Sequence, residues 1–170
     1  MSPERQPFIV GIAGGSCSGK TTIVEALSQR YPNSITVIMF DDYIFSKEQI
    51  DYSQIVDWEQ LDLYDVPRLR KDLVRIKNGE TVVYTSNSRE STDAGIKTRT
   101  ALPKPLVVIE GFLLLSDEEV RKQLDLRIFL EISEEELVRR RLARRNAGSN
   151  WDAETYIHTL LVEGHRNNVQ

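Results

Sequence analysis

The sequence predicts a three-layer α/β fold, in which a parallel β-sheet carries helices on both faces. Three observations lead to this prediction. Short apolar runs alternate along the chain with segments of helical character, a glycine-rich turn follows the first run, and acidic residues follow two others. Strands that alternate with helices are typical of parallel sheets, which are buried on both faces. Such sheets bind their ligands at the carboxyl ends of the strands, where the glycine-rich and acidic segments are expected to meet.

Five apolar segments predict the strands. The four strong ones are residues 8–13, 35–40, 106–109 and 126–132, and residues 81–84 predict a minor strand. Because each is bounded by turn residues or by helical patterns, the strong segments are expected to pair in one sheet. The stretch 86–104 is polar and is expected to be a loop.

Helices are predicted from apolar spacing and from end signals. Residues 21–30 have helical character, and Asp65 is the expected N-cap of a helix that has Pro67 in its first turn and ends at Asn78 and Gly79. Ser133 and Glu136 form a capping-box pattern, which predicts a helix from about residue 134. A last amphipathic helix is expected around residues 156–161.

The composition is that of an ordinary globular domain. The chain has 170 residues, of which 40% are hydrophobic, and a formal net charge of −4. We therefore expect a single domain over residues 1–170, and the acidic balance argues against a nucleic-acid partner. Apolar runs reach only about seven residues, far fewer than the roughly 20 that cross a bilayer. The lone Cys17 excludes an internal disulfide, and with no export-type leader visible we expect a cytoplasmic protein.

Residues 14–21 match the phosphate-loop pattern G-x-x-x-x-G-K-S/T in full, between a predicted strand and a predicted helix. Glycines there allow close backbone approach, and successive N–H groups at a helix N-terminus form a site for anions. We expect Lys20 to reach the β- and γ-phosphates and the Thr21 hydroxyl to bind Mg²⁺. The expected nucleotide site comprises Gly14, Gly15, Ser16, Cys17, Ser18, Gly19, Lys20, Thr21 and Thr22.

Acidic residues at two strand ends suggest phosphoryl transfer. Glu110 ends the apolar run 106–109, where its carboxylate can face the phosphate loop and hold Mg²⁺. Asp41 and Asp42 follow the second strand, where a carboxylate can accept the proton of an attacking hydroxyl. Each has a plainer alternative: an ordinary strand-end acid for Glu110, and a cap or turn acid for the aspartate pair.

Five arginines gather on the predicted helix after residue 134: Arg139, Arg140, Arg141, Arg144 and Arg145. A solvated helix face is the usual meaning of such a run, and Glu135 and Glu136 are spaced to pair with the first two arginines. Arg141 and Arg144 share a face, so their guanidinium groups can close over phosphates. Behind a phosphate loop, we interpret the cluster as a lid around residues 139–150.

Taken in order, these motifs resemble the uridine kinase and nicotinamide riboside kinase group of P-loop kinases, within the phosphoribulokinase/uridine kinase family. The motifs are the phosphate loop, Phe-Asp-Asp-Tyr at 40–43, Asp57-Trp58-Glu59, Ile-Glu-Gly-Phe-Leu-Leu at 109–114, and the arginine lid. The resemblance covers residues 8–165. It implies a P-loop NTPase fold with ATP and Mg²⁺ as cofactors.

The resemblance also implies a role for each matching residue. Asp41 is the expected catalytic acid–base, Thr21 and Glu110 the Mg²⁺ ligands, and Arg141 and Arg144 the catalytic lid arginines beside Lys20. Arg145 is assigned to the nucleotide, and the acceptor site is expected to comprise Asp41, Tyr43, Asp57, Trp58 and Arg89. Asp57 would bind ribose hydroxyls and Trp58 would lie against the base, although a packing role for Trp58 is an even alternative. Asn87 stands where uridine kinases have a histidine, and Val56 where an aromatic residue is common.

We therefore predict an ATP-dependent kinase that phosphorylates a primary hydroxyl of a nucleoside such as uridine, cytidine or nicotinamide riboside. No nucleic-acid or membrane partner is expected. Two alternatives remain: a kinase of another small metabolite (pantothenate, phosphoribulose or glycerate), and a nucleotide-binding module without transfer. Asp57 beside Trp58 favours a riboside over a sugar acid. The Asn-Lys-x-Asp segment of GTPases is absent from the sequence.

Overall fold

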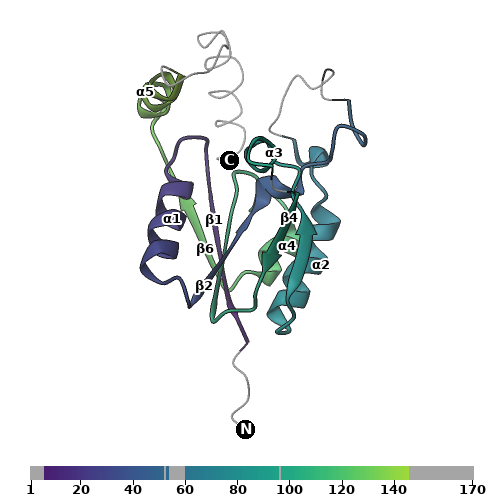
Figure 1. Cartoon of the computed structure of the whole chain (residues 1–170). Helices are drawn as coiled ribbons and strands as arrows, with labels where there is room; N and C mark the ends of the chain where they lie inside the picture. Colours follow the sequence, from purple (N-terminus) through teal and green to yellow (C-terminus); the bar gives the residue numbers. More distant parts are fainter. Residues whose placement is uncertain (1–5, 52, 54–59, 96, 146–170) are drawn as a thin grey trace.

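A computed structural model describes residues 6–51, 53, 60–95 and 97–145, and its centre is a four-stranded parallel sheet (Figure 1). The strands are β1 (Phe8–Gly14), β2 (Ile35–Met39), β5 (Leu106–Glu110) and β6 (Leu126–Leu130), in the spatial order β2-β5-β1-β6. All three neighbouring pairs are parallel, as predicted. The carboxyl ends of all four strands therefore lie at one edge of the sheet.

Helices cover both faces of this sheet, which confirms the predicted layers (Figure 1). On one face, α1 (Lys20–Arg30) packs Val24 against Val10 and Ile12 of β1. On the other face lie α2 (Val66–Lys77) and α4 (Glu118–Gln123), whose apolar side chains join the cluster that contains Ile9 and Ala13. Successive β1 side chains thus enter opposite cores, which is why the strand reads as one continuous apolar run.

The predicted start of α2 is confirmed. The Asp65 carboxylate accepts a hydrogen bond from the Arg68 amide at 3.1 Å, Pro67 lies in the first turn, and Asn78 is the C-cap. Helix α4 was not predicted, because six residues are too few to show an apolar period. Its cap, Asp117, accepts a hydrogen bond from the Val120 amide at 2.8 Å.

The capping box expected at α5 (Glu134–Arg145) forms only in part. The Ser133 hydroxyl accepts a hydrogen bond from the Glu136 amide at 3.3 Å, as predicted. The Glu136 carboxylate, however, accepts hydrogen bonds from Arg139 and Arg140. The prediction is therefore wrong for the reciprocal hydrogen bond of the box, from the Ser133 amide to the Glu136 carboxylate. Two guanidinium groups are stronger partners for a carboxylate than one backbone amide.

The loop predicted over residues 86–104 is also wrong. This segment contains α3 (Arg89–Asp93) and β4 (Thr98–Ala101), and β4 pairs antiparallel with β3 (Val82–Thr85) in a separate two-stranded sheet. We call β3, α3 and β4 together the β3–β4 lobe. The minor strand predicted over residues 81–84 is confirmed as β3. The polar sequence hid α3 and β4, because much of what attaches the lobe is buried polar contact described below.

Within the described ranges, no helix is both long and apolar enough to cross a membrane. The amphipathic helix predicted near residues 156–161 lies outside the described residues, as does the end of the lid. The assignment of residues 1–170 to a single domain stays a prediction.

Candidate active site

The loop between β1 and α1 has the backbone of an anion-binding nest. Gly14, Cys17 and Gly19 all have positive φ angles, of 145°, 63° and 101°. A Cβ on Gly14 would lie 2.5 Å from the Leu130 carbonyl oxygen, so only glycine fits at this position. Cys17 holds a left-handed conformation that costs a residue with a side chain roughly 1–2 kcal/mol. Strain of this kind is concentrated at functional sites, where it pre-organises the backbone for a ligand.

Two side chains of this loop suit a phosphate. The Lys20 ammonium is largely buried and donates hydrogen bonds to the carbonyl oxygens of Gly14, at 2.8 Å, and Gly15, at 2.9 Å. The Ser18 hydroxyl is buried and has no hydrogen-bond partner among the described residues. A buried hydroxyl without a partner is costly, and a phosphate oxygen would satisfy it. The loop therefore fits the triphosphate that its sequence predicts.

The two predicted Mg²⁺ ligands meet at the carboxyl edge of the sheet. The Thr21 hydroxyl donates to the Glu110 carboxylate at 2.7 Å, although the residues are 89 positions apart. Glu110 is only 4% exposed, and the pairing of β5 with β1 holds it opposite Ile12. A hydroxyl and a carboxylate are the hard oxygen donors that Mg²⁺ prefers. The fold thus assembles a donor set that suits this ion.

Gly111, next to Glu110, is a point of close contact between strand ends. A Cβ built there would lie 2.2 Å from the Phe40 Cβ, which is closer than side chains ever approach. Phe40 begins the single turn η1 (Phe40–Tyr43) after β2, so the predicted strand ends one residue early, at Met39. The contact brings the end of β5 against the turn that carries Asp41.

Asp41 and Asp42 are neighbours in opposite environments. Asp41 is exposed at the carboxyl edge of the sheet. Asp42 is 1% exposed and accepts hydrogen bonds from the hydroxyls of Ser86, Ser88 and Ser91. Of the two, only Asp41 is placed to meet a substrate hydroxyl. Its role as catalytic base stays a prediction.

Tyr43 was predicted to contact the acceptor, and the structure corrects this. The residue is 2% exposed, its hydroxyl donates to Asp72 at 3.1 Å, and its ring stacks on Tyr84 at 5.0 Å. Burial first, and then the charge of Asp72, raise the pKa of the Tyr43 hydroxyl well above its usual range. Tyr43 therefore packs in the core and offers no surface to an acceptor.

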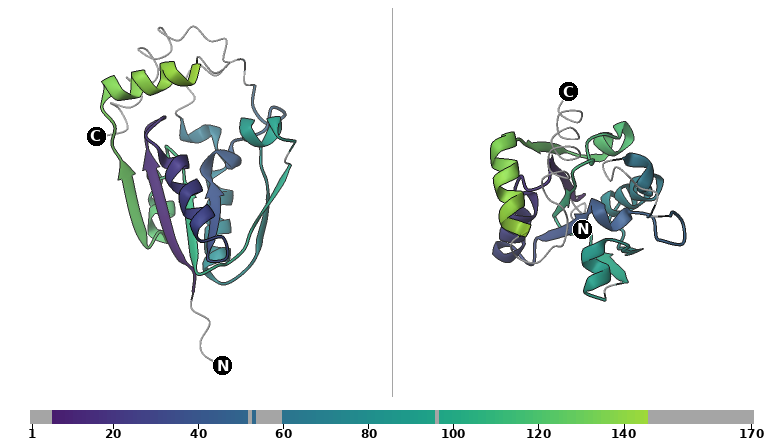
Figure 2. Two further views of the ribbon diagram at one scale, coloured as in Figure 1. Left: turned by 60° about the vertical axis from the view of Figure 1, so that its left-hand side comes forward. Right: turned by 90° about the horizontal axis from the view of Figure 1, so that it is seen from above.

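In Figure 2, helix α5 (yellow-green) lies beyond the carboxyl ends of the strands, on the side of the sheet that α1 covers. Arg140 donates to the Cys17 carbonyl oxygen at 3.1 Å, and Arg141 to the Ser16 hydroxyl at 3.4 Å. Arg141 was predicted to reach the phosphate loop, whereas Arg140 was assigned only to local pairing. The helix spacing that selected Arg141 could not show which neighbouring arginine also faces the loop.

One carboxylate organises two arginines of α5, the helix predicted to form the lid. Glu136 accepts hydrogen bonds from Arg139 and from Arg140, each at 2.6 Å. These two guanidinium groups hold the pKa of Glu136 down at about 2. Of the predicted pairs, Glu136 with Arg140 forms, while Arg139 pairs with Glu136 and not with Glu135.

The remaining predicted site residues are placed only in part. Thr22 is exposed on α1, and Arg89 begins α3, although its side chain is outside the description. Arg144 and Arg145 lie at the end of α5, again without described side chains. Asp57 and Trp58 lie outside the described residues.

The chain is similar in sequence to bacterial uridine kinases. The chain is 33% identical over 157 residues to a uridine kinase of Borrelia hermsii, covering 90% of this chain and 74% of that protein. It is 29% identical over 144 residues to a uridine kinase of Chlamydia pneumoniae, covering 81% of this chain and 63% of that protein. The chain therefore spans about three fifths of the length of the Chlamydia protein and about three quarters of the Borrelia protein.

The fold itself recurs in solved structures. A candidate fructose transport system kinase from Silicibacter sp. TM1040 superposes with a TM-score of 0.77 at 19% identity, covering 99% of this chain and 88% of that one. At that identity the likeness concerns the fold alone.

The profile of one protein family covers nearly the whole chain. It is described as the phosphoribulokinase / uridine kinase family and matches residues 9–162. The match confirms the predicted P-loop kinase fold and the predicted class of enzyme, a phosphotransferase with a hydroxyl acceptor. This chain belongs to the phosphoribulokinase / uridine kinase family.

Proposed function

We propose that this protein transfers the γ-phosphate of ATP to a primary hydroxyl of a nucleoside. The observation that carries the proposal is the contact of Thr21 with Glu110 at 2.7 Å beside the anion nest, with the exposed Asp41 at the neighbouring strand end. The uridine kinases that match this chain support a nucleoside acceptor.

The triphosphate would lie in the nest formed by residues 14–21. Backbone N–H groups at the start of α1 would bind its oxygens, and Ser18 would gain the partner it lacks. Lys20 would exchange its bonds to the carbonyl oxygens of Gly14 and Gly15 for the β- and γ-phosphates. This exchange replaces neutral acceptors by charged ones and so favours binding.

Thr21 and Glu110 would hold Mg²⁺, which when bound neutralises charge on the β- and γ-phosphates. Glu110 is buried and fixed by the strand pairing, so it does not need to reorganise for this task. The turn at 40–43 would present Asp41 to the acceptor hydroxyl.

Transfer then follows from position and charge. The hydroxyl proton passes to the Asp41 carboxylate as the acceptor oxygen bonds to the γ-phosphorus, and the bond from that phosphorus to the oxygen of ADP breaks. Arg140 and Arg141, already in contact with the phosphate loop, would offset charge on the transferred group. Their helix would also exclude water, which otherwise competes as acceptor.

The test is release of ADP from MgATP in the presence of uridine, cytidine, adenosine, nicotinamide riboside, pantothenate or glycerate. We expect turnover with a nucleoside and a loss of about 10²–10⁴-fold in Asp41→Asn, which keeps the shape of the side chain but cannot take the proton. Asp62→Asn, in the short helical turn η3 (Leu61–Leu63), is the matched control. Turnover with pantothenate or glycerate alone would contradict the nucleoside assignment. Binding of ATP without any acceptor-dependent turnover would favour a nucleotide-binding module.

A further inference from the structure

We propose that Asp42 and Arg99 form a positioning pair that fixes the turn carrying Asp41 and couples this turn to the β3–β4 lobe. The inference rests on the proposed function, because it concerns the residue assigned there as the base. The inference adds Asp42 and Arg99 to the residues that serve the reaction; both contact no reacting atom and act through Asp41.

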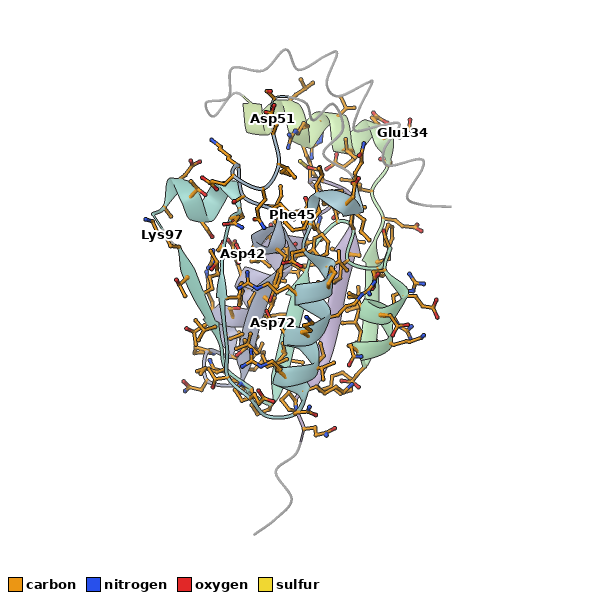
Figure 3. The ribbon with its side chains drawn as sticks, turned by 90° about the vertical axis from the view of Figure 1, so that its right-hand side faces the viewer. Asp42, Phe45, Asp51, Asp72, Lys97 and Glu134 are labelled. Carbon is orange, nitrogen blue, oxygen red and sulfur yellow. The ribbon has the colours of Figure 1, made fainter. Side chains whose placement is uncertain are left out.

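The first argument is the convergence of one segment on one carboxylate. Three serine hydroxyls from the lobe donate to Oδ1 of Asp42, from Ser86, from Ser88 at 2.7 Å and from Ser91 at 3.1 Å. The Arg99 guanidinium forms an ion pair with Oδ2 at 2.8 Å. In Figure 3, Asp42 lies between the ribbon of the lobe and helix α2. Both carboxylate oxygens are thus engaged by the lobe.

The second argument is that the backbone from Asp42 to Ile44 is also held. The Asn87 amide donates to the Asp42 carbonyl oxygen at 3.1 Å, and the Asn87 side chain to the Ile44 carbonyl oxygen at 3.0 Å. From the opposite side, the Asp65 amide donates to the Tyr43 carbonyl oxygen at 2.8 Å. Residues 42–44 are therefore fixed by the lobe and by the start of α2, and Asp41 directly precedes them.

The third argument concerns what the buried charge of the Asp42 carboxylate achieves. A buried carboxylate is costly even when it is paired, and apolar residues of similar volume often give equal or better stability. Hydrogen bonds to a carboxylate, such as those from the three serines, are directional, however, and fix geometry more tightly than apolar contacts do. Arg99 serves the same cluster twice, since it also donates to the Ser91 hydroxyl at 2.8 Å. The arrangement therefore suits precision of the turn more than stability of the lobe.

The experiment compares Asp42→Asn, Arg99→Gln and Arg99→Lys with wild type in the full chain. The matched control is Arg70→Gln, which breaks a somewhat more exposed ion pair, between Arg70 and Asp117, away from the phosphate loop and the acidic turn. For each variant we would measure kcat, the KM of the acceptor, the Kd of MgATP and the thermal unfolding temperature.

We expect kcat to fall about 10–100-fold in Asp42→Asn and about 10-fold in Arg99→Gln. Arg99→Lys keeps the charge and should recover most of that loss. The Kd of MgATP should stay within about twofold of wild type in all of them, because the phosphate loop is built on β1 and α1. Arg70→Gln should lower the unfolding temperature and leave kcat unchanged. A merely structural role would not separate kcat from nucleotide binding in this way.

If Asp42→Asn and Arg99→Gln both keep the wild-type kcat, this inference is overturned and the proposed function stands. An equal loss in Arg70→Gln, or a parallel loss of MgATP binding, would overturn it too, because the damage would then be general. If Asp42→Asn does not fold, Arg99→Gln and Ser88→Ala decide by the same criteria. A wild-type protein with no acceptor-dependent turnover would overturn the proposed function and this inference together.

Discussion

Glu136 is the residue that holds Arg139 and Arg140 on α5, and it makes stability depend on pH. Its pKa is held at about 2 by the hydrogen bonds from Arg139 and Arg140, below an unfolded value of about 4.3. A carboxylate whose pKa is lowered by folding stabilises the protein above the unfolded value, and this contribution is lost as the pH falls through the folded value. Its contribution is therefore complete at neutral pH and lost between about pH 4.3 and pH 2.

We therefore expect Glu136→Gln to lower the unfolding temperature at pH 7, and the difference from wild type to vanish as the pH approaches 2. Because this side chain lies at the surface, added salt should shrink the difference. Thermal unfolding from pH 7 to pH 2, at low and high salt, measures both effects. Glu135→Gln, on the same helical turn, is the control. A difference that persists unchanged at pH 2 would contradict the assignment.

Individual residues were predictable where a short motif defines them. The phosphate loop, Thr21 and Glu110 follow from a local pattern and from strand ends, and the structure brings them together. Arg140 and the partners of Asp42 were not predictable, because their contacts join distant positions and no motif or strand end marks the residues that meet. A tyrosine beside an acidic pair carries no sign of which way it points, which is why Tyr43 was misplaced.

At the scale of elements, the contact of Gly111 with Phe40 sets how the ends of β2 and β5 meet. Gly111→Ala would drive a Cβ into the Phe40 Cβ, which is near the backbone and cannot rotate away. We expect a loss of about 1–3 kcal/mol in the free energy of unfolding, as for other overpacked sites. Because the displaced segments carry Asp41 and Glu110, kcat should fall as well. Urea unfolding and steady-state kinetics measure the two effects.

The prediction would be contradicted if Gly111→Ala were as active as wild type and its free energy of unfolding lay within about 0.5 kcal/mol of the wild-type value. A change that small is typical of substitutions at the surface. Val83→Ala, at an exposed position of β3, is a convenient control for handling and assay.

Elements with strong local signals were predicted well. The four strands of the main sheet are apolar runs because both faces are buried, and α2 has a capped start and a clear apolar face. In the β3–β4 lobe, β3 was predicted but α3 and β4 were not, because part of the buried interior there consists of serines, and burial of a serine leaves no apolar period. Prediction from sequence works where apolar burial decides the structure, and it fails where polar partners decide.

At the scale of the whole molecule, nucleotide binding should stabilise the fold. A ligand present at 100 times its Kd adds about 2.7 kcal/mol to the free energy of unfolding. We expect MgATP to raise the unfolding temperature of the wild type, and to do so less in Glu110→Gln, because that variant loses a charged ligand for the ion. Thermal unfolding with ATP, with and without Mg²⁺, measures the difference.

Glu25→Gln, on the exposed side of α1, is the matched control and should respond like wild type. An equal stabilisation of Glu110→Gln and wild type by Mg²⁺ would show that Glu110 does not hold the ion.

The strand order also bears on synthesis. β1 leaves the ribosome well before its two partners in the sheet, which begin only at Leu106 and Leu126. At 5–20 residues per second, β1 waits about 5–20 s for β5 to be translated. During that time an apolar strand made for the centre of a sheet has no partner, which is when chaperones bind nascent chains. The phosphate loop, which follows β1 directly, is thus made long before the neighbouring strands that hold β1 in the sheet.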